Sequence, residues 1–226
     1  ANFQFDTWEK QILMASSSYL WDYIRKTGAA GVFIPLSGGQ DSGLTALFGY
    51  YMCMRLFTYY KEGAADVTRH LRRVIGIPDF DPKSPSEIAH HLLVTAYMGT
   101  AESSADSRKR ATDLAKFINT DHYEIDMDTI SQEIKSLITQ IFKIDLKFQA
   151  YGGTMMTDIA LQCITARLRM VMSYLLAQMA SLNKKKTSYY LVLSCTNLDE
   201  TVTGYFAKYG ASSGDLNLMG TLSKEE

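Results

Sequence analysis

The sequence predicts an α/β protein with a doubly wound, mostly parallel sheet and helices on both faces. Short apolar runs alternate along the 226 residues with longer segments whose apolar residues recur every three or four positions. The runs GVFIPL and YYLVLS are continuously apolar, as is typical of strands covered on both faces. A series of alternating strands and helices favours parallel pairing through crossover helices.

The first 85 residues are expected to supply a helix, a strand and a second helix. Apolar spacing near 3.6 residues predicts a helix over 8–26, which Gly28 closes. Residues 31–36 form the first buried strand, with a proline at its end. After the polar stretch SGGQDS, the segment GLTALFGYYMCMRLF predicts a long apolar helix. Residues 61–85 mix charge, glycine and proline and are expected to be irregular.

The middle of the chain predicts a second strand between two helices. SPSEIAHHLL indicates a short helix with Ser86 as its cap, and residues 92–97 indicate the strand. A loop then leads to a helix over 105–118, for which Ser103 or Ser104 is the expected N-cap.

The remaining elements follow the same alternation. HYEIDM alternates as a third strand, and SQEIKSLITQIF is helical in its spacing. The loop KFQAYGGTM precedes a long helix over 157–183, and residues 189–194 form the fourth strand. Ligands of such sheets bind at the C-terminal ends of the strands, where SGGQDS lies.

Composition narrows the functional classes. A formal net charge of −1 gives no general field for nucleic acid or an anionic membrane, and no apolar stretch reaches the ~20 residues that a membrane span needs. Cys53, Cys163 and Cys195 form no CxxC motif, and the four histidines are scattered, so no zinc cluster is expected. Three buried thiols in a reducing cytoplasm are the expectation.

SGGQDS has the composition of an anion-binding loop. Gly38 and Gly39 let the backbone approach a ligand closely, and the amides before the next helix converge on one point. Ser37 and Ser42 add hydroxyl donors. Asp41 would repel a phosphate unless a divalent cation lay between them. The loop lacks the lysine of the GxxxxGK[ST] motif, which favours holding a departing pyrophosphate; a glycine-rich turn capped by Ser and Asp is the alternative.

PLSGGQDS resembles the pyrophosphate loop of the N-type ATP pyrophosphatases. The later segments resemble NAD synthetases, in the style of the synthetase domain of the glutamine-dependent type; they are YMGTAESSADSRKRATDLA, ALQCITARLRM, TNLDETVTGYFAKYG and SSGDLNLMGTLSK. The resemblance implies ATP-dependent amidation of deamido-NAD to NAD through an adenylated intermediate. AMP and pyrophosphate leave, and the nitrogen is ammonia, delivered from glutamine where a glutaminase domain is present. Another amidotransferase-coupled ATP pyrophosphatase, such as a GMP synthetase, and a non-catalytic nucleotide-binding domain remain alternatives.

The resemblance also implies roles for individual residues. Asp41 and Glu200 would hold Mg²⁺ on the ATP phosphates, although Glu200 alone also fits a first-turn helix carboxylate. The implied ATP and pyrophosphate contacts are Ser37, Gly38, Gly39, Gln40, Asp41, Ser42, Tyr97, Met98, Thr196 and Lys224. The implied deamido-NAD contacts are Arg167, Lys208 and Asp215, with Arg169 as a nearby candidate. Arg108 and Arg110 are either ATP-side cations or surface charge, with surface charge favoured.

Some positions depart from the pattern of the family. Cys163 stands where the eukaryotic-style pattern has Asn, and Thr157 and Asp158 stand where it has Glu-Asn. SCT replaces GSA at 194–196, and Gln40 and this SCT resemble the ammonia-using bacterial branch.

We expect residues 1–226 to form a single synthetase domain without the N-terminal glutaminase domain and the C-terminal end of its relatives. The apolar helix over 157–183 and the resemblance together predict a homodimer or higher homo-oligomer. No nucleic-acid or membrane partner is expected.

Overall fold

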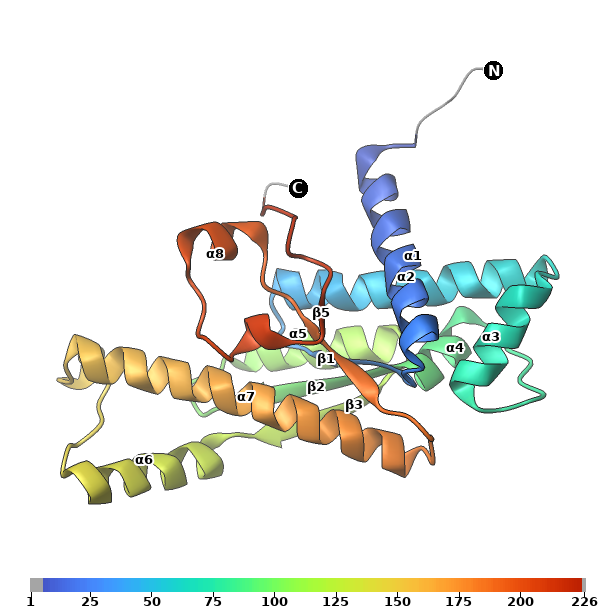
Figure 1. Cartoon of the computed structure of the whole chain (residues 1–226). Helices are drawn as coiled ribbons and strands as arrows, with labels where there is room; N and C mark the ends of the chain where they lie inside the picture. The colour runs from blue at the N-terminus through green and yellow to red at the C-terminus, as the bar shows by residue number, and fades with distance from the viewer. Residues whose placement is uncertain (1–5, 225–226) are drawn as a thin grey trace.

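The computed structural model describes residues 6–224, so the two ends of the expected 1–226 domain lie outside the described part. Five parallel strands form a sheet in the order β3-β2-β1-β4-β5, with helices on both faces (Figure 1). The predicted α/β class is confirmed. The strands are β1 (Gly31–Pro35), β2 (Leu93–Gly99), β3 (Asp121–Asp126), β4 (Tyr190–Ser194) and β5 (Leu216–Asn217).

Alternate residues of the central strand β1 enter two separate cores. Val32 and Ile34 pack with the helices that precede β3, whereas Phe33 points to the opposite face and packs near Met170. The first face is covered by α1 (Trp8–Thr27), α2 (Gln40–Lys61), α3 (Ala65–Ile75), α4 (Pro85–Leu92) and α5 (Ala105–Phe117). The second face is covered by α7 (Met155–Asn183), with α6 (Asp128–Phe142) alongside it (Figure 1).

Two expectations in the region 61–85 are wrong. The segment contains the helix α3, whose residues Val67, Leu71 and Val74 face the core at helical spacing. The cap of α4 is Ser84 rather than Ser86, because Pro85 occupies the first helical position and the Ser84 side chain accepts from Glu87 N. For α5 the expected cap Ser104 is confirmed.

The helix α2 begins three residues earlier than its apolar run. Gly39 is the N-cap and Gln40 the first helical residue, so Asp41 and Ser42 belong to the first turn of α2. The second half of the SGGQDS stretch is therefore a helix N-terminus rather than a loop, which strengthens its capacity to bind an anion.

The helices α6 and α7 extend as an arm beyond the edge of the sheet (Figure 1). By length and composition α7 could cross a membrane: a window of 18 residues has a mean hydropathy of 1.3, and only 17% of that window is buried. The sequence argument that no apolar stretch is long enough was therefore wrong for this helix. It packs on the sheet through Met170, Ala177 and Ala180, and it leaves several other apolar side chains exposed, among them Val171, Leu175, Met179 and Leu182.

Candidate functional site

A pocket of about 350 Å³ opens where β1, β2 and β4 end. Ser37 follows β1, Tyr97 and Met98 close β2, and Cys195 follows β4. Arg169 of α7 completes the wall from the second face of the sheet. The pocket therefore lies at the C-terminal edge of a parallel sheet, the expected position for a ligand site.

A network of hydroxyl groups shapes the SGGQDS stretch. Ser42 lies in the first turn of α2, and its Oγ accepts from Ser37 N at 3.2 Å and lies 2.9 Å from Ser37 Oγ. Ser42 Oγ also donates to Gly39 O, while Ser37 Oγ accepts from Gly39 N. Because the two serines bond to the loop itself, they hold its curvature; Gly39 and Gln40 are left exposed at the helix N-terminus.

Gly38 interlocks this loop with α5. Its φ of +78° is left-handed, and a Cβ there would lie 2.1 Å from the carbonyl oxygen of Ser107. One turn along α5, Arg110 Nε donates to Gly38 O at 2.8 Å. Arg110 thus contacts the loop, contrary to the preference for simple surface charge. It also lines a second pocket, of about 440 Å³, together with Gly39, Gln40 and other residues of the loop.

The carboxylates of Asp41 and Glu200 come from different elements but face the same region. Glu200 lies in α8 (Leu198–Thr203), where its Oε2 accepts from Asn197 N at 3.3 Å in a capping box. Within residues 6–224 the Asp41 carboxylate has no hydrogen bond or ion pair of its own. Burial, followed by Asp41 and Glu200, raises the pKa of the Cys195 thiol to about 11. Both carboxylates therefore lie close enough to act on one thiol in the pocket wall.

These two carboxylates suit a magnesium ion that is shared with phosphates. Mg²⁺ is usually held by one or two carboxylates and completes its shell with water and phosphate oxygens. In the described part of the chain no group of three His, Cys, Asp or Glu side chains is arranged to hold a metal alone. Asp41 has both carboxylate oxygens available within the described residues, and Glu200 has one. These two carboxylates therefore fit a metal that binds together with its nucleotide.

The end of β2 is fixed from both faces of the sheet. Tyr97 is buried, its hydroxyl lies 2.9 Å from Ser107 Oγ, and the Arg108 guanidinium carbon lies 5.7 Å from its ring centre. On the other face Arg169 Nε donates to Met98 O at 3.0 Å. Burial lowers the pKa of the Arg169 guanidinium, and Tyr97 opposes this effect. Arg169, only a secondary candidate in the sequence, is the arginine of α7 that lines the pocket.

Thr196 and Lys224 lie around α8 rather than in the wall of the main pocket. Thr196 is buried, and its carbonyl accepts from Asn217 Nδ2 at 2.9 Å. The C-terminal segment returns along α8: Leu198 N donates to Leu222 O, and Lys224 N donates to Asp199 Oδ2. The structure thus brings Lys224 to the helix that carries Glu200.

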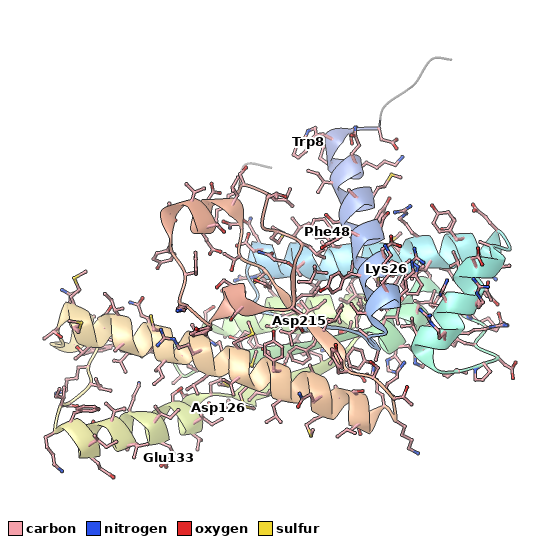
Figure 2. The ribbon with its side chains drawn as sticks, viewed as in Figure 1. Trp8, Lys26, Phe48, Asp126, Glu133 and Asp215 are labelled. Carbon is pink, nitrogen blue, oxygen red and sulfur yellow. The ribbon has the colours of Figure 1, made fainter. Side chains whose placement is uncertain are left out.

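The three residues expected to contact deamido-NAD lie along one side of α7. Arg167 Nε donates to Lys208 O at 2.9 Å, which joins two of them. Asp215 lies over the middle of α7 (Figure 2), where Oδ1 accepts from Tyr174 OH at 3.2 Å and Oδ2 from Val192 N at 2.8 Å. Arg167 and Tyr174 are two helical turns apart, about 10 Å. Asp215 therefore has both oxygens engaged with the chain.

The residues that depart from the pattern of the family organise the start of α7. Thr157 forms a capping box with Thr154, and its hydroxyl also bonds to Lys147 O at 2.9 Å. Asp158 Oδ1 accepts from Gln149 N at 2.9 Å. Thr157 and Asp158 thus tie α7 to the preceding loop, and Cys163 one turn further is half-buried with a free thiol.

Comparison with known proteins shows the family of the chain. The family model described as NAD synthase matches residues 12–226. Among curated proteins, the chain is 39% identical over 221 residues to a glutamine-dependent NAD(+) synthetase of Dictyostelium discoideum, covering 97% of the chain and 31% of that protein. It is 37% identical over 218 residues to a putative glutamine-dependent NAD(+) synthetase of Schizosaccharomyces pombe, covering 96% and 31%. The chain thus spans about a third of the length of these relatives.

A solved structure gives the same result for the fold. The glutamine-dependent NAD(+) synthetase of Cytophaga hutchinsonii superposes with a TM-score of 0.80 at 25% sequence identity. The match covers 96% of this chain and 36% of the other.

Proposed function

Because the chain belongs to the NAD synthase family, we propose that it converts deamido-NAD to NAD with ATP and ammonia. The observation that carries the proposal is that Asp41 of the SGGQDS stretch and Glu200 of α8 both act on Cys195, which lines the pocket at the C-terminal edge of the sheet. Family membership favours this reaction over that of a GMP synthetase.

In the first step, a nicotinate carboxylate oxygen of deamido-NAD attacks the α-phosphorus of ATP, and pyrophosphate leaves. The amide of Gln40, the first helical residue of α2, receives its negative charge. Asp41 and Glu200 would hold magnesium, which would supply positive charge to offset the charge that builds on the leaving group. In the second step, ammonia attacks the acyl carbon and AMP departs with the bridging oxygen.

The deamido-NAD substrate is proposed to lie along α7, where Arg167 meets Lys208. Two neighbouring cations, joined by the hydrogen bond from Arg167 Nε to Lys208 O, suit a dinucleotide, which carries two phosphates. Asp215 is also proposed to contact deamido-NAD, because it lies beside Tyr174 of α7. Its two carboxylate oxygens each accept one hydrogen bond from the chain.

The ammonia is proposed to come from outside this chain. Glutamine hydrolysis commonly uses a cysteine whose pKa is low. Here burial raises the pKa of Cys53, and the pKa of Cys195 is raised to about 11, so neither is an activated nucleophile. In a longer protein of this kind, a glutaminase region would deliver ammonia to the pocket.

Product analysis tests the proposed function. The chain is incubated with MgATP and ammonium chloride, with deamido-NAD or with xanthosine monophosphate as the acceptor. With deamido-NAD as the acceptor we expect equal amounts of NAD, AMP and pyrophosphate, and with xanthosine monophosphate we expect no reaction. We also expect no reaction when glutamine replaces ammonium. ATP binding without pyrophosphate release would instead favour the non-catalytic alternative.

A further inference from the structure

The SGGQDS stretch has no cation of its own, yet in the proposed function it receives a pyrophosphate. The pocket beside it is lined by residues of the loop and of α2 and α5, and within residues 6–224 Arg110 is the charged residue that lines it. Lys109, the next cation on α5, pairs instead with Asp113 and points to solvent.

The guanidinium of Arg110 is anchored at one end and free at the other. Nε donates to Gly38 O at 2.8 Å across 72 residues of sequence. Within the described part of the chain the two Nη groups make no hydrogen bond or ion pair. Arginine can serve two acceptors at once because its five N–H groups are held in a rigid fork.

The peptide that Arg110 holds sets the direction of the phosphate-binding amides. Gly38 has a left-handed backbone and lies against the Ser107 carbonyl, so its carbonyl has a defined orientation. Gly39 follows as the N-cap, and Gln40 begins α2. A hydrogen bond to Gly38 O therefore fixes the turn from which the first amides of α2 project.

We propose that Arg110 is a positioning residue of the SGGQDS loop and supplies the positive charge that the loop lacks. Its Nε holds the Gly38 peptide, and its Nη groups face the pocket in which the β- and γ-phosphates are received. The proposal rests on the proposed function and adds to it a residue from α5, outside the motif. It assigns to Arg110 a role distinct from that of Lys224, which lies beside α8.

Calorimetric titration with magnesium pyrophosphate and with MgATP tests this role without deamido-NAD or ammonia. We compare Arg110→Ala and Arg110→Lys with Lys109→Ala, which removes the same charge from the adjacent position. We expect Arg110→Ala to weaken pyrophosphate binding about tenfold or more, and Lys109→Ala to change it less than twofold. Arg110→Lys restores part of the affinity, because lysine keeps the charge but cannot bond to the carbonyl and the phosphate together.

A salt series separates the charge from the anchoring of the loop. If Arg110 contacts the phosphates, the affinity of the wild-type chain falls more steeply with salt than that of Arg110→Ala. Equal pyrophosphate affinity for Arg110→Ala and Lys109→Ala would overturn the proposal. Should the wild-type chain bind MgATP but form no NAD, the proposed function fails while these titrations still decide the role of Arg110.

Discussion

The Asp41 carboxylate contributes few contacts to the fold. The residue lies half-buried in the first turn of α2, and its carboxylate makes no hydrogen bond or ion pair within residues 6–224. An acidic residue in a first turn stabilises a helix by less than ~1 kcal/mol. The residue therefore contributes little to stability, and its main effect is on the charge of the site.

We predict that Asp41→Asn lowers kcat roughly 100-fold or more, the scale of losing one preorganised charge contact in a transition state. Unfolding free energy should fall by less than ~1 kcal/mol, since only the helix-dipole interaction is lost. Asp113→Asn on α5 is the matched control, because it removes one surface carboxylate that pairs with Lys109. NAD formation near the wild-type rate in a folded Asp41→Asn protein would exclude the metal role.

At the scale of single residues, the sequence predicts those site residues that are neighbours in the chain. Ser37 to Ser42 are neighbours in the chain, so their chemistry can be read together. Arg110 and Arg169 reach the site through contacts across 72 and 71 residues, and no local pattern distinguishes them from other charges on their helices. Their roles become visible only when α5 and α7 are packed on the sheet.

Helices and strands were predictable wherever their apolar pattern was strong. Flanking glycine and proline and several charged residues obscured α3, whose apolar residues are few. The short elements α8 and β5 depend on local capping and on pairing with β4, which periodicity does not detect. Periodicity also does not detect the contact between the SGGQDS loop and α5, because this contact depends on Gly38 fitting against the distant carbonyl of Ser107.

We predict that Gly38→Ala is much more damaging than Gly63→Ala. Both glycines are left-handed, with φ of +78° and +80°, so both substitutions cost about 1–2 kcal/mol in backbone strain. A Cβ at Gly63 meets nothing within 4 Å, whereas at Gly38 it meets the Ser107 carbonyl at 2.1 Å. In Gly38→Ala the helix α5 would have to move away, which should lower the free energy of unfolding by about 1–3 kcal/mol more. Chemical denaturation measures the free energy of unfolding of both variants. Equal losses in the two variants would mean that the loop is not packed tightly against α5.

On the scale of the whole molecule, the arm formed by α6 and α7 exposes an apolar surface that a monomer leaves in water. Val171, Leu175, Met179 and Leu182 form a stripe along α7, and each side chain is at least 46% exposed. Leu137, Ile141 and Ile144 are also exposed, on and just beyond α6. Exposed apolar patches of this kind mark interaction surfaces. We propose that a second copy of the chain covers this surface, as the expected homodimer requires.

Sedimentation velocity tests this assembly. We predict a dimer at micromolar concentration for the wild-type chain and a monomer for the double substitution Val171→Glu with Leu175→Glu, because two buried charges without partners oppose association. Met54→Glu is the control: this residue is 42% exposed on α2, away from the arm. A wild-type chain that sediments only as a monomer would contradict the assembly.

The proposed function depends on the adenylation of a carboxylate, and oxygen transfer tests this step most directly. Deamido-NAD labelled with ¹⁸O in its nicotinate carboxylate is incubated with the chain, MgATP and ammonium. The ¹⁸O content of each product is then measured by mass spectrometry. Attack on the α-phosphorus predicts one ¹⁸O in AMP and none in pyrophosphate. ADP or inorganic phosphate carrying the label, or unlabelled AMP formed together with NAD, would contradict the account.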